Sequence, residues 1–288
     1  MKIIDIVYEW IDSNREFLKE LKQRQIVSQQ AKYGPGEVYE KVHDNNKVCF
    51  VLSTGRSGTK LLTKIFGDHQ NVLALHQPIP ELIHFNKLAY QGFDSNDSEL
   101  KSMIDIARYE YVRKAFLLNK HYVETNSGIT FFAYQLASLY PNAKFIHLIR
   151  EPVAFVQSGC SRGWYDNDSG FDEGRIQGSD GNRADWNDMS QVGKIAWLWN
   201  ETNSFIHKFK ESIPASRIMT VKSEELFGDS KVMGAIFKFL SLAPLEGQHV
   251  ENLLSKKVNK QMNKTALTKA QVEEVQANTP IKENYYKS

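Results

Sequence analysis

The stretch Lys47-Val-Cys-Phe-Val-Leu-Ser53 is a short, continuous apolar run, and no other part of this sequence constrains the fold as strongly. Such a run is typical of a strand that is buried on both faces of a parallel sheet. It leads directly into Thr54-Gly-Arg-Ser-Gly-Thr-Lys60, and helical spacing of apolar residues resumes at Thr59. A buried strand, a glycine-containing loop and a helix start direct backbone N–H groups and a helix dipole at one point. The sequence therefore predicts an anion-binding loop.

The rest of the chain alternates apolar runs with helical patterns. We expect strands at 72–75, 122–124, 144–149 and 217–221, and helices at 59–66, 81–90, 99–117, 130–140, from 152 and at 191–210, with further helices closing the chain. This alternation predicts an α/β fold with a central parallel sheet flanked by helices. Amphipathic spacing from residue 3 to about residue 30 indicates a helical N-terminal extension at 1–45, so the α/β domain is assigned to 46–288.

Composition excludes several classes of protein. The 36 Lys and Arg residues nearly balance the 34 Asp and Glu residues, which argues against a nucleic-acid binder. No apolar run approaches the roughly 20 residues of a membrane span. The N-terminus lacks the features of a signal peptide, and the only cysteines are Cys49 and Cys160. We therefore expect a cytoplasmic protein with reduced thiols.

The loop differs from that of nucleotide triphosphatases. A Walker loop requires G-x-x-x-x-G-K-[ST], but Ser53 replaces the first glycine and Thr59-Lys60 reverses the final order. The lysine and the magnesium-binding hydroxyl are therefore out of register. Arg56 places a positive charge inside the loop instead, which suits a smaller phosphate group held without metal.

Two motifs carry a family resemblance. Thr54-Gly-Arg-Ser-Gly-Thr-Lys-Leu-Leu62 resembles the 5′-phosphosulfate loop of sulfotransferases that use 3′-phosphoadenosine 5′-phosphosulfate (PAPS). The segment 141–158, a strand that ends in Arg150 and a helix that carries Ser158, resembles the family's grip on the 3′-phosphate. Weaker matches are Val221-Lys-Ser-Glu-Glu-Leu226 and Lys257-Val-Asn259. The resemblance implies a P-loop NTPase-like sulfotransferase fold, similar to carbohydrate-type and tyrosylprotein-type members.

The resemblance also implies PAPS as sulfuryl donor, 3′-phosphoadenosine 5′-phosphate (PAP) as product, and no metal. Independently, Arg150 ends a buried strand and should project at the carboxyl edge of the sheet, where ligands of α/β folds bind. A planar guanidinium also suits a phosphate. The expected cofactor-binding residues are Arg56, Ser57, Gly58, Thr59, Lys60, Leu61, Arg150, Ser158, Arg162, Lys222 and Lys257.

Sulfuryl transfer to a hydroxyl requires a base for the acceptor proton. In the family this base often follows the next strand, roughly twenty residues after the loop arginine. Counting from Arg56 leads to His76, and an imidazole suits the task at neutral pH. Several carbohydrate-type relatives have Glu-Pro where this chain has Gln77-Pro78. We therefore expect His76 as the base, Glu81 as second candidate, and Lys60 as the cation for the bridging oxygen.

The expected function is transfer of a sulfuryl group from PAPS to the hydroxyl of a carbohydrate, lipid or small metabolite. One alternative is a small-molecule kinase, which the shifted lysine disfavours. Another is a catalytically silent PAP-binding protein, which Gln77 motivates. The acceptor is the only partner expected, and the oligomeric state stays open.

Three further features are interpreted structurally. The segment from Trp164 to Met189 is rich in turn formers and should be a long loop with few apolar contacts. We assign His147, Trp197 and Trp199 to the core. The basic run 256–264 is either solvated or closes over the 3′-phosphate.

Overall fold

The computed structural model describes residues 20–92, 98–166, 172, 174–180, 183–255 and 266–286. Residues 20–30 are helical, and the earlier part of the expected N-terminal helix lies outside the described residues. The elements are, in chain order, α2 (Pro35–His43), β1 (Val48–Leu52), α3 (Thr59–Gly67), β2 (Val72–His76), α4 (Ile83–Gln91), α5 (Ser98–Leu117), β3 (His121–Thr125), the 3₁₀ helix η1 (Ser127–Phe132), α6 (Ala133–Leu139), β4 (Lys144–Ile149), α7 (Pro152–Cys160), η2 (Trp186–Asp188), α8 (Gln191–Glu211), η3 (Ala215–Arg217), β5 (Ile218–Lys222), α9 (Ser223–Gly228), α10 (Ser230–Phe239), α11 (Gly247–Ser255), α12 (Lys269–Ala277) and η4 (Pro280–Asn284).

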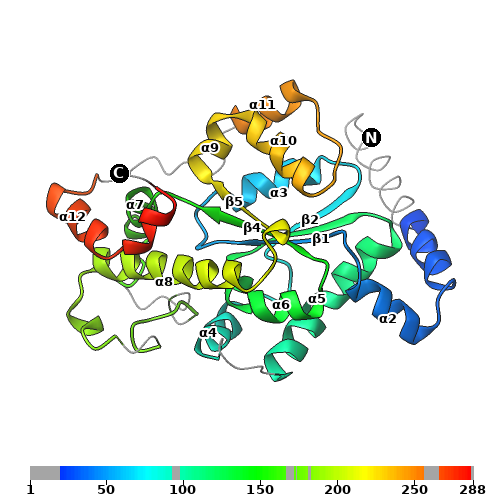
Figure 1. Ribbon diagram of the computed structural model, residues 1–288, viewed down its shortest axis with the longest axis horizontal. Helices are drawn as coiled ribbons and strands as arrows, with labels where there is room; N and C mark the ends of the chain where they lie inside the picture. The colour runs from blue at the N-terminus through cyan, green and yellow to red at the C-terminus, as the bar shows by residue number, and fades with distance from the viewer. Residues whose placement is uncertain are drawn as a thin grey trace, which may run out of the picture.

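The five strands form one parallel sheet in the order β2-β3-β1-β4-β5 (Figure 1). Strand β1 lies at its centre, paired with β3 on one side and β4 on the other. After β1 the chain goes to β2 on one side of the sheet, whereas after β3 it crosses β1 to β4 on the other side. The loops that follow β1 and its neighbours therefore diverge. In open α/β sheets such a switch of direction leaves a crevice at the carboxyl ends of the strands, where ligands bind.

Two apolar cores lie on opposite faces of the sheet. Phe50 and Leu52 of β1 belong to the core under α5, α6 and α8. Cys49 and Val51 point the other way, into the core under α3, α10 and α11. Figure 1 shows these helix groups on opposite sides of the sheet. The predicted α/β fold, with a parallel sheet covered by helices on both faces, is confirmed.

Most of the local expectations agree with the structure. His147, Trp197 and Trp199 are buried, and Nε2 of His147 lies 2.9 Å from Oδ1 of Asn203. The segment 164–189 differs from its expectation, because its described part contributes Ile176 and Trp186 to the first core. The burial of these two residues could not be predicted, because turn-forming residues surround them and neither belongs to a periodic apolar pattern.

A buried ion pair joins helix α5 to the sheet. Arg108 and Glu124 are both fully buried, and Nε of Arg108 lies 2.8 Å from Oε2 of Glu124. The side chains of Tyr122 and Asn126 also donate to this carboxylate. Nη1 of Arg108 donates to the carbonyl of Pro80, at 3.2 Å. The pair therefore ties α5 to β3 and to the turn that follows β2.

A second polar contact joins α2 to α5. Nε2 of His43 lies 2.8 Å from Oδ1 of Asp105, and Nδ1 lies 2.9 Å from the carbonyl of Tyr39. A carbonyl and a carboxylate only accept, so the doubly protonated imidazolium satisfies both contacts. Burial lowers the pKa of His43, but the hydrogen bonds to Asp105 and Tyr39 outweigh it and the pKa is raised. Burial raises the pKa of Asp105, but its hydrogen bonds from His43 and Tyr39 lower it on balance.

We expect this contact to make stability depend on pH. A raised pKa for His43 gives stability that is present below about pH 6.5 and lost as pH rises through the folded pKa. A lowered pKa for Asp105 gives stability that is present above about pH 4 and lost as pH falls through the folded pKa. Urea unfolding should show that His43→Gln destabilises by roughly 1.5–3 kcal/mol at pH 5.5, and by less at pH 9.

His84→Gln, the same change at an exposed histidine on α4, is the matched control and should leave stability nearly unchanged. A destabilisation by His43→Gln that is equal at pH 5.5 and pH 9 would contradict the charged contact.

Candidate functional site

A cavity of about 910 Å³ opens at the carboxyl edge of the sheet. The loop after β1, the end of β2, and the starts of η1, α4 and α9 contribute to its walls, together with α7 and α8. These segments are distant in sequence and meet because parallel strands bring their carboxyl ends to one edge. The cavity therefore lies where the strand order predicts a ligand site.

The loop between β1 and α3 has its carbonyl groups occupied by side chains. The hydroxyl of Ser57 donates to Gly55 O at 3.0 Å, and that of Ser223 donates to Ser57 O at 2.7 Å. Nη1 of Arg150 donates to Arg56 O at 2.8 Å. No partner among the described residues engages the N–H groups of Arg56, Ser57 and Gly58. The loop is thus a set of backbone donors, which suits an anion.

Two glycines give the loop its course. Gly55 and Gly58 have φ values of 76° and 96°, and Arg56 between them is also left-handed, at 56°. A Cβ on Gly58 would lie 2.5 Å from Cζ of Phe227, so this aromatic ring packs directly against the loop. Gly58 is also the N-cap of α3, and the first N–H groups of a helix have no partner within it. Backbone donors of the loop and of α3 therefore face the same cavity.

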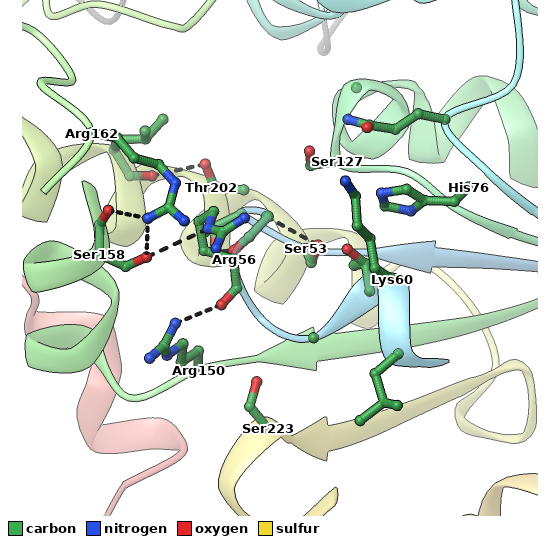
Figure 2. Close-up of a pocket in the computed structure, with 18 of the residues that line it drawn as sticks. Ser53, Arg56, Lys60, His76, Ser127, Arg150, Ser158, Arg162, Thr202 and Ser223 are labelled. Atoms are coloured by element: carbon green, nitrogen blue, oxygen red, sulfur yellow. Dashed lines mark hydrogen bonds between the residues drawn. The ribbon is translucent and has the colours of Figure 1, made fainter. Parts of the chain in front are cut away.

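Arg56 and Arg162 contact the same serine, and Arg150 is bonded to the backbone of Arg56 beside them (Figure 2). Nη1 of Arg162 donates to the hydroxyl of Ser158 at 2.9 Å and to its carbonyl at 2.8 Å. Nε of Arg56 lies 3.4 Å from the same hydroxyl. Arg150 enters from the end of β4, where the indole N–H of Trp199 holds its carbonyl at 2.8 Å. All four clustered residues line the cavity.

Burial and the positive charges of this cluster lower the pKa values of Arg56 and Arg162. Burial lowers the pKa of the Arg56 guanidinium, and the charges of Arg162 and Arg150 lower it further. Burial and the charge of Arg150 lower the pKa of Arg162 in the same way. Burial also lowers the pKa of Arg150, although Glu224 and Glu151 partly offset it. Arginines remain protonated, so an anion placed among them relieves the repulsion.

His76 ends β2 and its ring has a defined tautomer. Nδ1 lies 2.8 Å from the carbonyl of Thr125, which only accepts, so Nδ1 carries the proton in the neutral ring. Nε2 is therefore left with a lone pair. Burial lowers the pKa of His76, and the charge of Lys60 also lowers it, which outweighs the hydrogen bond to Thr125. The imidazole is thus a neutral proton acceptor at pH 7.

The other two candidates for proton and charge transfer also line the cavity. Lys60, in the first turn of α3, extends beside His76 (Figure 2). Glu81 is exposed and lies in the turn between β2 and α4. The hydroxyl of Thr125 contacts both the His76 ring and the hydroxyl of Thr63 on α3. Thr125 therefore connects His76 to the helix that starts at the anion loop.

The remaining expected residues are placed as follows. Gly58, Thr59 and Leu61 line the cavity, whereas Ser57 is fully buried within the loop and does not line it. Lys222 ends β5, does not line the cavity, and forms a 3.2 Å ion pair with Glu225. Lys257 lies outside the described residues.

Several residues that line the cavity or contact its lining are absent from the sequence-based set. Ser223 and Phe227 contact the loop from α9, and they lie in or next to the motif 221–226, so its match contained a usable signal. Thr125 and Ser127 follow the third predicted strand, and the rule that ligands bind at strand ends would have found them. Trp164 and Arg175 stack with the guanidinium 4.3 Å from the ring, a contact between loop residues that no pattern indicates.

Two searches of the described residues give negative results. They contain no group of three or more His, Cys, Asp and Glu side chains arranged to hold a metal ion. Among the same residues, no helix combines the length and the apolar character needed to cross a membrane.

Comparisons with known proteins agree with this geometry. The model of a family described as the sulfotransferase family matches residues 49–246. A search of curated proteins finds no match to the sequence. The crystal structure of a sulfotransferase from Mycobacterium avium superposes with a TM-score of 0.51 at 12% identity, covering 91% of this chain and 81% of that one. That similarity supports the fold.

Two other solved structures are also similar. The sulfotransferase domain from the curacin biosynthetic pathway has a TM-score of 0.48 at 17% identity, covering 69% of this chain and 75% of that one. The sulfotransferase domain of the olefin synthase from Synechococcus PCC 7002 has a TM-score of 0.47 at 16% identity, covering 80% of this chain and 93% of that one.

The geometry predicts how His76 titrates. In ¹⁵N-labelled protein, its Nδ1 should carry the proton at pH 7, because the Thr125 carbonyl accepts from it. Its pKa should lie below 6.5, because burial and Lys60 disfavour the imidazolium. Histidine ¹⁵N spectra recorded across pH, with His76→Gln identifying the resonances, measure both quantities. An Nε2–H tautomer, or a pKa above 6.5, would contradict this arrangement.

Proposed function

The chain belongs to the sulfotransferase family, and on that premise we propose that it moves a sulfuryl group from PAPS to an acceptor hydroxyl, releasing PAP and a sulfate ester. The observation that carries this proposal is the pairing of two anion sites in one cavity. One is the set of backbone donors between β1 and α3 with Lys60. The other is the arginine cluster around Ser158. A donor with phosphate groups at two ends of a nucleoside requires such a pair.

The residues present are suited to the two ends of PAPS. In this proposal the loop N–H groups and Lys60 hold the 5′-phosphosulfate, because they surround the start of α3. Arg150, Ser158 and Arg162 hold the 3′-phosphate through charge-assisted hydrogen bonds. Arg56 lies between the two groups and serves either anion. Its contact with the Ser158 hydroxyl is long, at 3.4 Å, so little is lost when the guanidinium turns toward a ligand.

Phe227 is suited to the adenine. Its side chain is 47% exposed although its ring packs on Gly58, so one part of the ring remains available for stacking. Leu61 and Leu254 also line the cavity and supply apolar contacts for the base. Lys222 and Lys257 stay assigned to the cofactor by family resemblance alone.

Bound PAPS supplies a sulfuryl group whose bond to the phosphate oxygen breaks as the acceptor oxygen bonds to sulfur. In the proposed mechanism Nε2 of His76 accepts the hydroxyl proton, because Thr125 keeps the lone pair on that nitrogen. The ammonium of Lys60, beside His76, stabilises the charge that develops on the departing phosphate oxygen. Lys60 also disfavours the imidazolium, so the same cation keeps the base neutral before the reaction.

Calorimetry in EDTA tests the donor assignment. PAP should bind without metal, and Arg150→Ala should weaken PAP by about ten- to a hundred-fold, because a charge-assisted contact contributes about 1.5–3 kcal/mol. Adenosine 5′-phosphosulfate lacks the 3′-phosphate, so its affinity should change little. Arg113→Ala, which removes an arginine paired with Glu110 on α5, is the control and should leave both affinities unchanged.

Two results would count against this assignment. Equal weakening of both ligands would show that Arg150 does not contact the 3′-phosphate. Binding of ATP with magnesium as tight as that of PAP would favour the kinase alternative.

Steady-state sulfation assays test the base. His76→Ala should lower turnover by about two to four powers of ten, because it removes the proton acceptor. PAP affinity should barely change, since the ring is not assigned to the donor. Glu81→Gln, the control for the second candidate, should keep most of the activity. If Glu81→Gln abolishes turnover while His76→Ala does not, the base is Glu81.

A further inference from the structure

The lining of the cavity also includes residues of a different kind from those of the two anion sites. Ile83, Phe131, Trp164, Ile176 and Leu198 line it. They come from α4, η1, the segment after α7, and α8, so the apolar surface is assembled from four parts of the chain. We call these five residues the apolar wall. The adenine of PAP is already assigned to Phe227, Leu61 and Leu254, so these five residues are left for the acceptor.

Polar side chains near the wall are already engaged within the protein. Oδ1 of Asn86 accepts from the backbone N–H of Phe131 at 3.0 Å, and its Nδ2 donates to Ser127 O at 3.5 Å. The hydroxyl of Thr202 donates to Leu198 O at 2.8 Å. A hydroxyl group of a ligand that is placed here would find fewer hydrogen-bond partners than in water.

The charged residue beside the wall is engaged as well. Arg175 forms an ion pair with Asp172, and its guanidinium lies 4.3 Å from the centre of the Trp164 ring. The stacked guanidinium covers part of the indole and leaves the rest of the ring to the cavity. Arg175 therefore completes the wall and keeps its charge on the carboxylate of Asp172.

The polar groups that remain are on the side of the transfer chemistry. His76, Gln77 and Glu81 line the cavity at the end of β2, and Lys60 lies beside His76. The acceptor space thus has one polar end, where the reacting hydroxyl must lie, and one apolar side. This division suits a molecule with a hydroxyl at one end and a hydrocarbon skeleton behind it. A sugar, with hydroxyls on every side, fits it poorly.

Helix α4 joins the wall to the outside of the protein. Its Ile83 packs against Gly174, where an added Cβ would overlap Cγ2 of the isoleucine. The outer residues Ile79, Phe85 and Leu88 are 76%, 41% and 50% exposed. Exposed apolar residues therefore flank the segment that carries Glu81 and Ile83.

From this arrangement we propose that the acceptor is an apolar alcohol, with its hydroxyl at His76 and its hydrocarbon skeleton against the apolar wall. The proposal rests on the proposed function and selects a lipid-type acceptor over a carbohydrate. It also assigns Ile83 as a residue that determines acceptor specificity. A polar side chain at position 83 should lower activity with apolar alcohols and leave the affinity for the nucleotide unchanged, because Ile83 packs against Gly174 and not against the anion loop.

The test is a sulfation assay with PAPS and straight-chain primary alcohols of increasing length, with glucose and N-acetylglucosamine as the carbohydrate arm. The value of kcat/KM should rise by roughly three- to fourfold per methylene until the wall is covered, which corresponds to the transfer free energy of one methylene. Carbohydrates should react far more slowly than long alcohols. No dependence on chain length, or carbohydrates that react as well, would overturn the inference.

The matched variants are Ile83→Asn and Ile106→Asn, which make the same change on the wall and at a residue of α5 that is 83% exposed. Ile83→Asn should lower kcat/KM for a long alcohol at least tenfold and leave PAP affinity unchanged, whereas Ile106→Asn should change neither. If Ile83→Asn does not fold, the chain-length series in the unaltered protein still decides the question.

Calorimetry separates the two levels of the proposal. Long alcohols should bind to the complex with PAP more tightly than short ones. Binding of PAP without binding of any alcohol would overturn the inference about the acceptor and leave the proposed function in place. Failure of PAP itself to bind would instead remove the proposed function.

Discussion

Strand β1 is buried on both faces and hydrogen-bonded along both edges, and the rest of the structure depends on this constraint. Its neighbours β3 and β4 satisfy its backbone up to Leu52, but the next residues leave the sheet and need other partners. Side chains supply them by donating to the loop carbonyls: Ser57 of the loop itself donates to Gly55, and Arg150 and Ser223 from distant elements donate to Arg56 and Ser57. With the carbonyls engaged, the loop presents its N–H groups, so the anion site is a consequence of how the chain leaves its central strand.

The buried pair of Arg108 and Glu124 extends this order to the side of the cavity that holds His76. Arg108 holds the carbonyl of Pro80, and Tyr111 from the same helix donates to the carbonyl of Ile79 at 2.7 Å. The turn that carries Gln77 and Glu81 is thereby held to α5. A buried ion pair is costly to desolvate and contributes little net stability, but removal of one partner leaves an uncompensated charge. Its main effect here is therefore positional.

Electrostatics divides the cavity into regions with different tasks. The guanidinium groups of Arg56, Arg150 and Arg162 repel one another, which makes that region selective for anions. Lys60 extends the positive potential to His76 and lowers the pKa of the imidazole. Beyond His76 the wall is apolar, and its polar neighbours are engaged within the protein. In the proposed arrangement, one cavity holds both an anionic nucleotide and a hydrocarbon skeleton, and His76 lies between the two.

Local sequence determined a large part of this protein. The unbroken apolar runs predicted the strands, and the glycines predicted the loop. Arg56, His76 and Arg150 could be found because they lie at or after the ends of β1, β2 and β4, and the carboxyl ends of parallel strands form the ligand edge. Only the tertiary structure decided that Thr125 sets the tautomer of His76, that Ser223 and Phe227 contact the loop from α9, and that five apolar residues from four segments form one wall. Strand and helix periods arise from neighbours in sequence, whereas these contacts join residues whose proximity depends on the order of strands in the sheet, and no local pattern encodes that order.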